Sequence, residues 1–361
     1  MRILHVITSL ETGGAERLMV ELLPLLLEAS NVVELLLFDG KETHLKHELQ
    51  QKGVIIHELS KKGRVNKLFG GVYNPLNIIK LRRFLRNYDI LHTHNTACQL
   101  YVPIAKLITG SKSTLITTEH NSTNRRRSMD WFKPIDKWMY RQYNAIICIA
   151  DQTRVNLENH IGNQSKMITI YNGVNLAKYL QQINDVSVRS EYVLTMVAAF
   201  RPQKDQDTLL RALTHLPDSY RLQFVGSGER EERVKSLCCD LALDRRVTFL
   251  GVRSDVSCIL RKSDIVVLSS HWEGLSLSSI EGMASGRPFI ASDVDGLREI
   301  VGGAGLLFKQ GDDVELANKI QWLCEHPDEY REVAKRCQER ACQYDISIMA
   351  EKYLQLYNGM I

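Results

Sequence analysis

Short apolar segments rich in β-branched residues alternate with helix-like segments along most of the chain, and no other feature constrains the fold as strongly. Such alternation predicts βαβ units on a buried parallel sheet. A polar interval at about residues 180–190 separates two sets of these units, and 361 residues suffice for two domains. We therefore predict an α/β protein of two domains joined near residue 180. The expected strands are residues 3–7, 32–38, 54–59, 89–94, 115–120, 146–149, 192–198, 222–225, 247–250, 265–268 and 289–291.

Composition and the first residues of the chain argue against several classes of protein. The chain is 44% hydrophobic and 24% charged, as ordinary globular proteins are and disordered ones are not. No segment approaches the roughly 18 apolar residues of a membrane-spanning helix. Residues 1–7 carry one positive charge and an apolar run too short for a signal peptide, so they indicate a first strand. We expect a cytoplasmic protein that is not integral to a membrane.

The net charge of +4 is unevenly distributed between the two halves. Residues 1–180 carry 24 Lys and Arg against 15 Asp and Glu, a net +9, whereas residues 181–361 carry 22 against 27, a net −5. Basic clusters of this kind indicate an anionic partner, either lipid headgroups or nucleic acid, unless they are simply a solvated surface. The basic residues in question are Lys61, Lys62, Arg64, Lys67, Lys80, Arg82, Arg83, Arg86, Arg125, Arg126, Arg127, Lys133, Lys137 and Arg141.

Candidate functional residues follow the expected strands, and ligands of open α/β sheets bind at the carboxyl ends of strands. Gly13 and Gly14 follow the first strand, where backbone N–H groups at a helix N-terminus could approach a phosphate, although any tight turn can use glycine. His94 and His120 close two further strands. The segment 226–228 resembles a dinucleotide fingerprint, but its third glycine is replaced by Glu231, which disfavours a nicotinamide enzyme.

Two carboxylates, Glu273 and Glu281, flank a predicted strand-to-helix turn. A carboxylate accepts two hydroxyl hydrogen bonds, which suits the vicinal diol of a sugar or ribose. Backbone N–H groups of residues 275–277 at the helix start suit a diphosphate between them. The spacing is unsuitable for a pair of glycosidase acids, which must face each other across one bond.

A metal site is not indicated. The segment Asp293-Val294-Asp295 matches a D-x-D pattern that could hold a divalent cation through hard oxygen ligands. A loop that carries Gly296 is the simpler interpretation, and no other group of His, Cys or carboxylate residues has convincing metal-ligand spacing. We expect no metal requirement and no cofactor apart from the substrate itself.

In this order and spacing the motifs resemble glycosyltransferase family 4, the retaining, two-domain GT-B enzymes typified by bacterial capsule and lipid-linked oligosaccharide transferases. The most specific motif is the family's E-x7-E, formed here by Glu273 and Glu281. The resemblance covers essentially the whole chain, and its further segments are residues 13–17, 119–121, 171–175, 204–205, 224–229, 249–251 and 286–293.

The resemblance implies roles for individual residues. His120 and Glu273 would be catalytic, His120 at the donor sugar and reaction face and Glu273 on sugar hydroxyls beside the anomeric carbon. Glu281 would bind the ribose, while Lys204 and the N–H groups after Glu273 would stabilise the departing diphosphate. The expected donor-binding residues are Gly13, Gly14, Arg201, Lys204, Gly226, Val252, Gly274, Leu275, Ser276, Leu277 and Glu281.

Two positions depart from the family pattern. The family has an arginine five residues before the lysine, where this chain has Ala199, and Arg201 lies two positions later. Either Arg201 reaches the diphosphate or Lys204 acts without it. Asp295 replaces a common glycine, which affects only the local loop.

The resemblance also implies a domain organisation and a reaction. Residues 1–180, with a returning helix at 346–361, would bind the acceptor, and residues 181–345 would bind a nucleotide sugar, which the family leads us to expect to be UDP-linked. The two Rossmann-like sheets would face each other across a cleft that closes for catalysis. The acceptor would be a glycan or polyprenyl-diphosphate-linked saccharide presented at the inner face of the plasma membrane.

Three alternatives remain open from the sequence. An epimerase or phosphorylase could share the GT-B fold, and product analysis would separate it from a transferase. A basic nucleic-acid-binding protein would explain the first half, but no groove-reading motif accompanies the charge, so we expect no nucleic acid. A silent sugar-nucleotide sensor would bind UDP without turnover.

Overall fold

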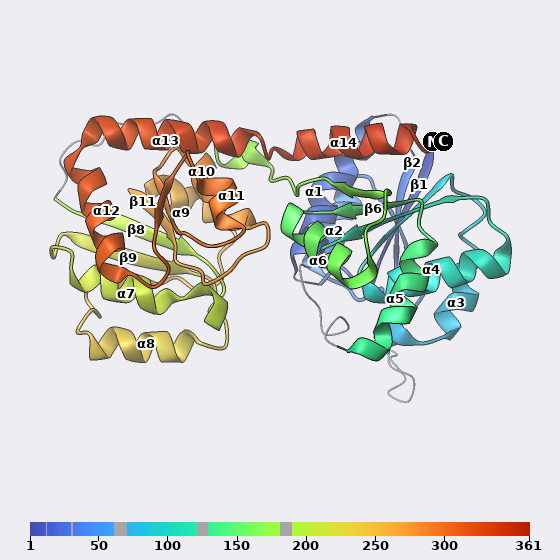
Figure 1. The fold of residues 1–361 in the computed structure, drawn as a ribbon, viewed down its shortest axis with the longest axis horizontal. Helices are drawn as coiled ribbons and strands as arrows, with labels where there is room; N and C mark the ends of the chain where they lie inside the picture. Colours follow the sequence, from blue (N-terminus) through green and yellow to red (C-terminus); the bar gives the residue numbers. More distant parts are fainter. Residues whose placement is uncertain (12, 30–31, 61–70, 121–128, 181–189) are drawn as a thin grey trace. The chain divides into compact units, whose positions relative to one another are not determined.

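The computed structural model describes residues 1–361 except 12, 30–31, 61–70, 121–128 and 181–189. The chain divides into two compact units (Figure 1). The first comprises Met1–Gly173 and Ile346–Ile361, and the second comprises Val174–Asp345. The two-domain α/β prediction is confirmed.

The first unit is built on a seven-stranded, wholly parallel sheet with the order β3-β2-β1-β4-β5-β6-β7. The last five residues of each of β1 and β2 are buried, and four of the five are apolar, as expected for strands covered on both faces. The strands are β1 (Arg2–Ile7), β2 (Val32–Leu37), β3 (Ile55–Glu58), β4 (Ile90–His94), β5 (Thr114–Glu119), β6 (Ala145–Cys148) and β7 (Met167–Thr169).

Helices cover both faces of this sheet, because alternate strand residues point to opposite sides. Ile3 and Ile90 belong to a core shared with α1, α2 and α14, whereas Leu4 and Leu91 belong to a second core shared with α3, α4, α5 and α6. The helices are α1 (Gly14–Glu28), α2 (His44–Gln51), α3 (Leu76–Leu81), α4 (Thr96–Thr109), α5 (Lys133–Arg141), α6 (Asp151–Ile161) and α14 (Ile346–Asn358).

The second unit is built on a six-stranded parallel sheet with the order β10-β9-β8-β11-β12-β13 around one large core. The strands are β8 (Tyr192–Val197), β9 (Tyr220–Val225), β10 (Val247–Phe249), β11 (Ile265–Leu268), β12 (Phe289–Ser292) and β13 (Leu306–Phe308). The helices are α7 (Gln206–Thr214), α8 (Glu231–Asp240), α9 (Val256–Lys262), α10 (Leu277–Ala284), α11 (Leu297–Val301), α12 (Asp313–Glu325) and α13 (Pro327–Cys342).

The structure differs from the sequence-based expectation in three places. Strands β7 and β13 were not predicted, because each is a three-residue edge strand with only one fully buried residue. The units divide after Gly173, so the expected boundary at residue 180 falls inside the second unit. The reason is packing: Val174 and Leu176 lie in the second unit's core, and the Val174 N–H donates to the Tyr344 carbonyl at 2.9 Å.

The C-terminal helix returns to the first unit, as the family resemblance implied. Helix α14, red in Figure 1, packs against α1. Its Met349, Tyr353 and Tyr357 are buried in the core that α1 shares with the sheet. None of the helices in the described part of the chain is long and apolar enough to cross a lipid bilayer.

Candidate active site

Lys204 and Glu273 come together at the carboxyl ends of two neighbouring strands of the second unit. Lys204 follows β8 in a 3₁₀ turn (η5, Pro202–Lys204), and Glu273 follows β11. The Lys204 ammonium forms an ion pair with Glu273 Oε1, and their side chains are only 16% and 6% exposed. The two opposite charges compensate each other where burial would otherwise make each of them costly.

Neighbouring polar groups hold the Glu273 carboxylate in place. Ser270 Oγ donates to Glu273 Oε1 at 2.6 Å, and Gln203 Nε2 lies 3.4 Å from Oε2. Gln203 also donates to the Trp272 carbonyl at 2.7 Å, so it ties the loop after β8 to the loop after β11. Sequence reasoning missed Gln203, because a glutamine that supports a carboxylate from another loop leaves no spacing pattern of its own.

Asp205 fixes the direction in which the chain leaves Lys204. Its φ of +47° is left-handed, and its side chain caps α7 by accepting from the Thr208 N–H at 3.4 Å and the Thr208 hydroxyl at 2.6 Å. Ser269 Oγ, at the end of β11, donates to the Asp205 carbonyl at 2.7 Å. Burial raises the pKa of Asp205. This capped turn sets the position of the lysine before it.

The start of α10 supplies the predicted helix N-terminus. The helix begins at Leu277, Ser276 is its N-cap residue, and the Ser276 side chain does not cap it. Gly274 and Leu275 lead into this turn from Glu273, and Glu281 lies half-buried just over one turn into the helix. The partial positive charge of a helix N-terminus is therefore close in sequence to both carboxylates.

Gly296 is required by the loop that carries Glu273. Its φ is +82°, and a Cβ there would collide with the backbone of Glu273 and Gly274. Both carboxylates of the neighbouring D-x-D segment contact Arg298. Arg298 Nε lies 2.6 Å from Asp293 Oδ1, and its Nη1 lies 3.3 Å from Asp295 Oδ1. The loop interpretation of this segment accords with these contacts.

The other predicted donor-binding residues of the second unit lie on separate loops. Gly226 has a φ of +140°, and a Cβ there would collide with the Ala198 carbonyl, so two loops at the sheet edge approach closely. Its N–H donates to the Gly251 carbonyl at 2.8 Å, next to Val252, which is 76% exposed. Arg201 is exposed at the start of η5.

In the first unit, Gly13 is the N-cap residue of α1 and Gly14 begins the helix. A Cβ at Gly13 would collide with Glu16, whereas a Cβ at Gly14 would meet nothing within 4 Å. The open space beside Gly14 means that packing within the protein does not require a glycine there. We still predict that a ligand approaches the backbone of Gly14 closely.

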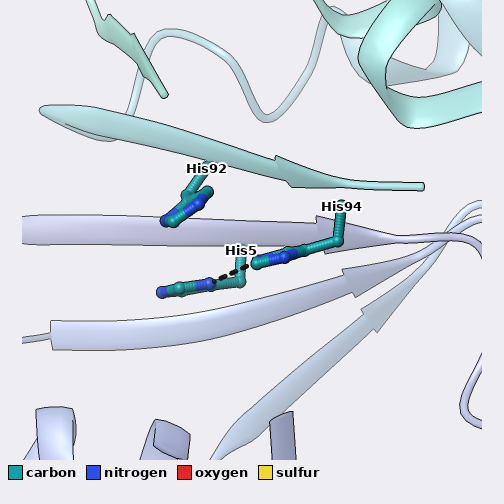
Figure 2. A group of neighbouring side chains, drawn as sticks. All are labelled: His5, His92 and His94. Atoms are coloured by element: carbon teal, nitrogen blue, oxygen red, sulfur yellow. Dashed lines mark hydrogen bonds between the residues drawn. The ribbon is translucent and has the colours of Figure 1, made fainter. Parts of the chain in front are cut away.

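The two histidines that the sequence singled out are hydrogen-bonded to each other. His94 Nδ1 and His120 Nε2 are 2.9 Å apart, and burial lowers the pKa of His120 to about 4. Two more histidines join them: His5 Nδ1 lies 3.0 Å from His94 Nε2, and the His92 ring stacks on both (Figure 2). Sequence reasoning missed His5 and His92 because it treated both as ordinary strand residues.

Gly14 and His120 thus belong to the first unit, and Lys204, Glu273 and Glu281 belong to the second. The roles of all the predicted site residues remain predictions.

The architecture is the GT-B fold. HepE of Anabaena in complex with UDP superposes with a TM-score of 0.85 at 22% identity, over 99% of this chain and 100% of that one. TarM of S. aureus superposes with a TM-score of 0.76 at 14% identity, over 99% of this chain and 98% of that one. At these sequence identities, the structural similarity establishes the fold alone.

The family follows from the sequence of both units. The model of Glycosyltransferase Family 4 matches residues 12–178, and the model of Glycosyl transferases group 1 matches residues 178–343. The chain belongs to glycosyltransferase family 4 and is a glycosyltransferase.

Curated relatives carry related names. EpsD of Bacillus subtilis is 26% identical over 80% of this chain and 82% of its own length. The UDP-Gal:alpha-D-GlcNAc-diphosphoundecaprenol alpha-1,3-galactosyltransferase of Escherichia coli is 29% identical over 61% of this chain and 62% of its own length. The chain thus aligns with less than two thirds of the E. coli enzyme.

Proposed function

We propose that this enzyme transfers a hexosyl group from a UDP-sugar to a polyprenyl-diphosphate-linked saccharide during assembly of a bacterial surface polysaccharide. The E. coli relative is named for that class of donor and acceptor. A Campylobacter jejuni relative, 30% identical over 60% of this chain, is named as an N-acetylgalactosaminyltransferase acting on a diphospho-undecaprenol-linked sugar. HepE has been crystallised with UDP and with UDP-glucose. These names support the donor and acceptor classes.

The observation that carries the mechanism is the ion pair of Lys204 with Glu273. In our proposal the Lys204 ammonium and the N-terminus of α10 face the diphosphate of the donor. The bond between the anomeric carbon and the phosphate oxygen breaks, and negative charge develops on the leaving UDP. A fixed cation and a helix N-terminus stabilise that charge most when water is excluded. Glu273, held by Ser270 and Gln203, accepts hydrogen bonds from hydroxyls of the transferred sugar.

The acceptor hydroxyl completes the reaction on the same face of the sugar. Its oxygen bonds to the anomeric carbon, and its proton passes to the phosphate oxygen that leaves, so UDP departs and the anomeric configuration is retained. In this scheme the positive charge near the diphosphate comes from protein groups, so we propose that no metal ion is required. Activity that survives chelation by EDTA is the expected result.

A transfer assay tests the proposal. The full-length protein is incubated with labelled UDP-hexoses and UDP-N-acetylhexosamines and a short-chain polyprenyl-diphosphate-linked sugar. Glycosylated lipid with the donor's α configuration, read by NMR, is expected from at least one donor. Transfer from GDP-sugars alone would overturn the choice of UDP, and an epimerised or phosphorolysed product without a new glycosidic bond would overturn the reaction.

We further propose that the first unit binds the anionic membrane surface at which such an acceptor is presented. Exposed apolar side chains lie beside basic ones on α3 and on the end of α4, and α3 packs against α4. Ile79 is 61% exposed and Leu107 is 61% exposed. A groove of about 390 Å³ there has a mainly basic lining that suits a lipid phosphate: Ile79, Lys80, Arg82, Arg83, Arg86 and Thr109.

Two exposed tryptophans lie on or just before α5, which packs against α4. Trp131, in the 3₁₀ turn η3 (Asp130–Phe132) before α5, is 66% exposed, and Trp138 on α5 is 39% exposed. Tryptophan favours the headgroup region of a bilayer, because its ring is apolar and its N–H is polar. This mixture of apolar, aromatic and basic groups favours a membrane surface over nucleic acid. The basic residues at 61–67 and 125–127 lie outside the described residues.

A further inference from the structure

A buried chain of hydrogen bonds links seven side chains on one face of the first unit's sheet and ends at His120. It begins at the Tyr353 hydroxyl on α14, 3.0 Å from Thr118 Oγ1 on β5, which lies 2.8 Å from His92 Nε2. His92 Nδ1 is 2.6 Å from the Tyr357 hydroxyl, which lies 3.4 Å from His5 Nε2. From His5 the hydrogen bonds continue through His94 to His120. Six of the seven side chains are fully buried.

The geometry of the rings favours a hydrogen-bond chain over a metal site. One nitrogen from each of His5, His92 and His94 lies within 4.8 Å of the other two. However, the His92 ring is stacked on the rings of His5 and His94, with interplanar angles of 30° and 22°, whereas the His5 and His94 rings are nearly coplanar and meet edge to edge in their hydrogen bond (Figure 2). Imidazole lone pairs lie in the ring plane, so the lone pairs of His92 do not converge on one ion with those of the two rings that it stacks on. Both nitrogens of His92 are also engaged, with Tyr357 and Thr118.

The far end of the chain determines the direction of every hydrogen bond in it. Burial lowers the pKa of all four histidines, so each ring is neutral and has one N–H donor and one acceptor nitrogen. Tyr353 is fully buried, and Thr118 is the one acceptor recorded for its hydroxyl among the described residues. A buried O–H without an acceptor is costly. Tyr353 therefore donates to Thr118.

Each later bond then follows in the same direction. Thr118 donates to His92 Nε2, His92 Nδ1–H donates to Tyr357, and Tyr357 donates to His5 Nε2. His5 Nδ1–H donates to His94 Nε2, and His94 Nδ1–H donates to His120 Nε2. His120 must then carry its proton on Nδ1. That nitrogen is enclosed and has no hydrogen-bond partner among the described residues.

We propose that this chain of hydrogen bonds fixes His120 in the Nδ1–H tautomer and thereby presents an N–H donor to an oxygen atom of the bound saccharide substrate. The unsatisfied donor follows the carboxyl end of β5, on a residue that is half-buried as a whole although its Nδ1 is enclosed. His5, His94, Tyr353 and Tyr357 are positioning residues that act through His120. The use of the donor in transfer rests on the proposed function, whereas the tautomer does not.

Nitrogen-15 NMR of the full-length protein, labelled at histidine, tests the tautomer without any substrate. The His120 signals are assigned by their loss in His120→Asn. Long-range proton–nitrogen correlations are expected to show a protonated Nδ1 and a bare Nε2. A protonated Nε2 in the wild type would overturn the proposal, as would displacement of the His5, His92 and His94 signals by stoichiometric Zn²⁺, which would instead assign a metal site.

Two conservative variants test the chain itself. Tyr353→Phe removes the hydroxyl that sets the direction, and Tyr357→Phe interrupts the chain between His92 and His5. Each should give a mixture of His120 tautomers and lower kcat/KM about 5- to 10-fold, the loss of one hydrogen bond. Unchanged His120 signals in both variants would overturn the proposal. Altered signals with unchanged transfer would leave the tautomer assigned and remove its role in the reaction.

Tyr143→Phe is the matched control. The Tyr143 hydroxyl is also buried and also bonded to β4, at 2.9 Å from Thr93 Oγ1, but it lies on the opposite face of the sheet. Its loss should destabilise the domain as much as the other two changes and leave the His120 tautomer as it is. If Tyr143→Phe changed the His120 signals as much as Tyr357→Phe does, the change would be a general effect of packing, and the proposed hydrogen-bond chain would be overturned.

Discussion

The Lys204 ammonium pairs with Glu273 Oε1 although the two residues are 69 positions apart in the sequence. Neighbouring strands β8 and β11 bring them together, and Gln203 and Ser270 keep the carboxylate in place. A charge pair that already exists without substrate is preorganised for a reaction in which negative charge develops next to it.

Lys204→Ala should lower kcat by about 100- to 1,000-fold, because one group that stabilises the leaving diphosphate is lost. It also leaves the buried Glu273 carboxylate without its cation. Lys204→Ala/Glu273→Gln should therefore recover thermal stability but not turnover, measured by differential scanning calorimetry and the transfer assay. Lys309→Ala, at an exposed position of the same unit, is the control. Wild-type turnover in Lys204→Ala would refute the assignment.

Glu281→Ala should weaken UDP binding by about 1–3 kcal/mol, the cost of losing hydrogen bonds from a carboxylate to the ribose hydroxyls. Calorimetric titration with UDP and with 2′,3′-dideoxy-UDP isolates this contribution. The variant should bind UDP more weakly than the wild type does, and both proteins should bind the dideoxy compound equally. A loss of the same size for both ligands would show that Glu281 does not contact the ribose.

Arg201→Ala tests whether the arginine compensates for Ala199 at the family's arginine position. If the guanidinium reaches the diphosphate, the variant should lose about 10- to 150-fold in affinity for UDP and nothing in affinity for uridine, since a charge-assisted hydrogen bond contributes about 1.5–3 kcal/mol. Arg233→Ala, at a 73% exposed side chain of the same unit, is the comparison. Unchanged UDP affinity would mean that Lys204 acts without Arg201.

Binding to liposomes tests the surface on α3 and α4. Co-sedimentation should increase with the fraction of anionic lipid and fall with added salt, because each basic residue near such a membrane contributes about 1 kcal/mol. Arg82→Glu/Arg83→Glu should abolish most of it, whereas Lys335→Glu/Arg336→Glu, the same charge change on exposed residues of α13, should not. Binding insensitive to both salt and lipid charge would contradict the electrostatic proposal.

The sequence predicted those features that depend on local pattern. The long buried strands, the start of α10 and the choice of Lys204 and Glu273 as candidate site residues were all accessible, because each depends on a short segment or a known spacing. Strands β7 and β13 were not, because three residues carry too little periodicity.

The histidine chain was inaccessible for a different reason. It depends on the register that places His5 beside His92, and on α14, which brings Tyr357 to residues 265 positions away in the sequence. Neither the register nor the docking of a distant helix can be read from the residues themselves. The role of Gln203 could not be predicted for the same reason, since it depends on two loops that meet only in the folded protein.

The neutral histidines also predict how the stability of the first unit depends on pH. Burial lowers the pKa of His120 from 6.5 to about 4 and that of His5 to about 3. Between those values and 6.5 the unfolded chain binds protons that the folded chain does not, so the free energy of unfolding falls as the pH falls. For His120 the full change is on the order of 3 kcal/mol.

Urea unfolding at a series of pH values measures how steeply the free energy of unfolding depends on pH. His120→Asn should flatten this dependence, and His44→Asn, at a side chain 89% exposed, should not. A slope that His120→Asn leaves unchanged would mean that His120 is already protonated, or equally exposed, in the folded protein.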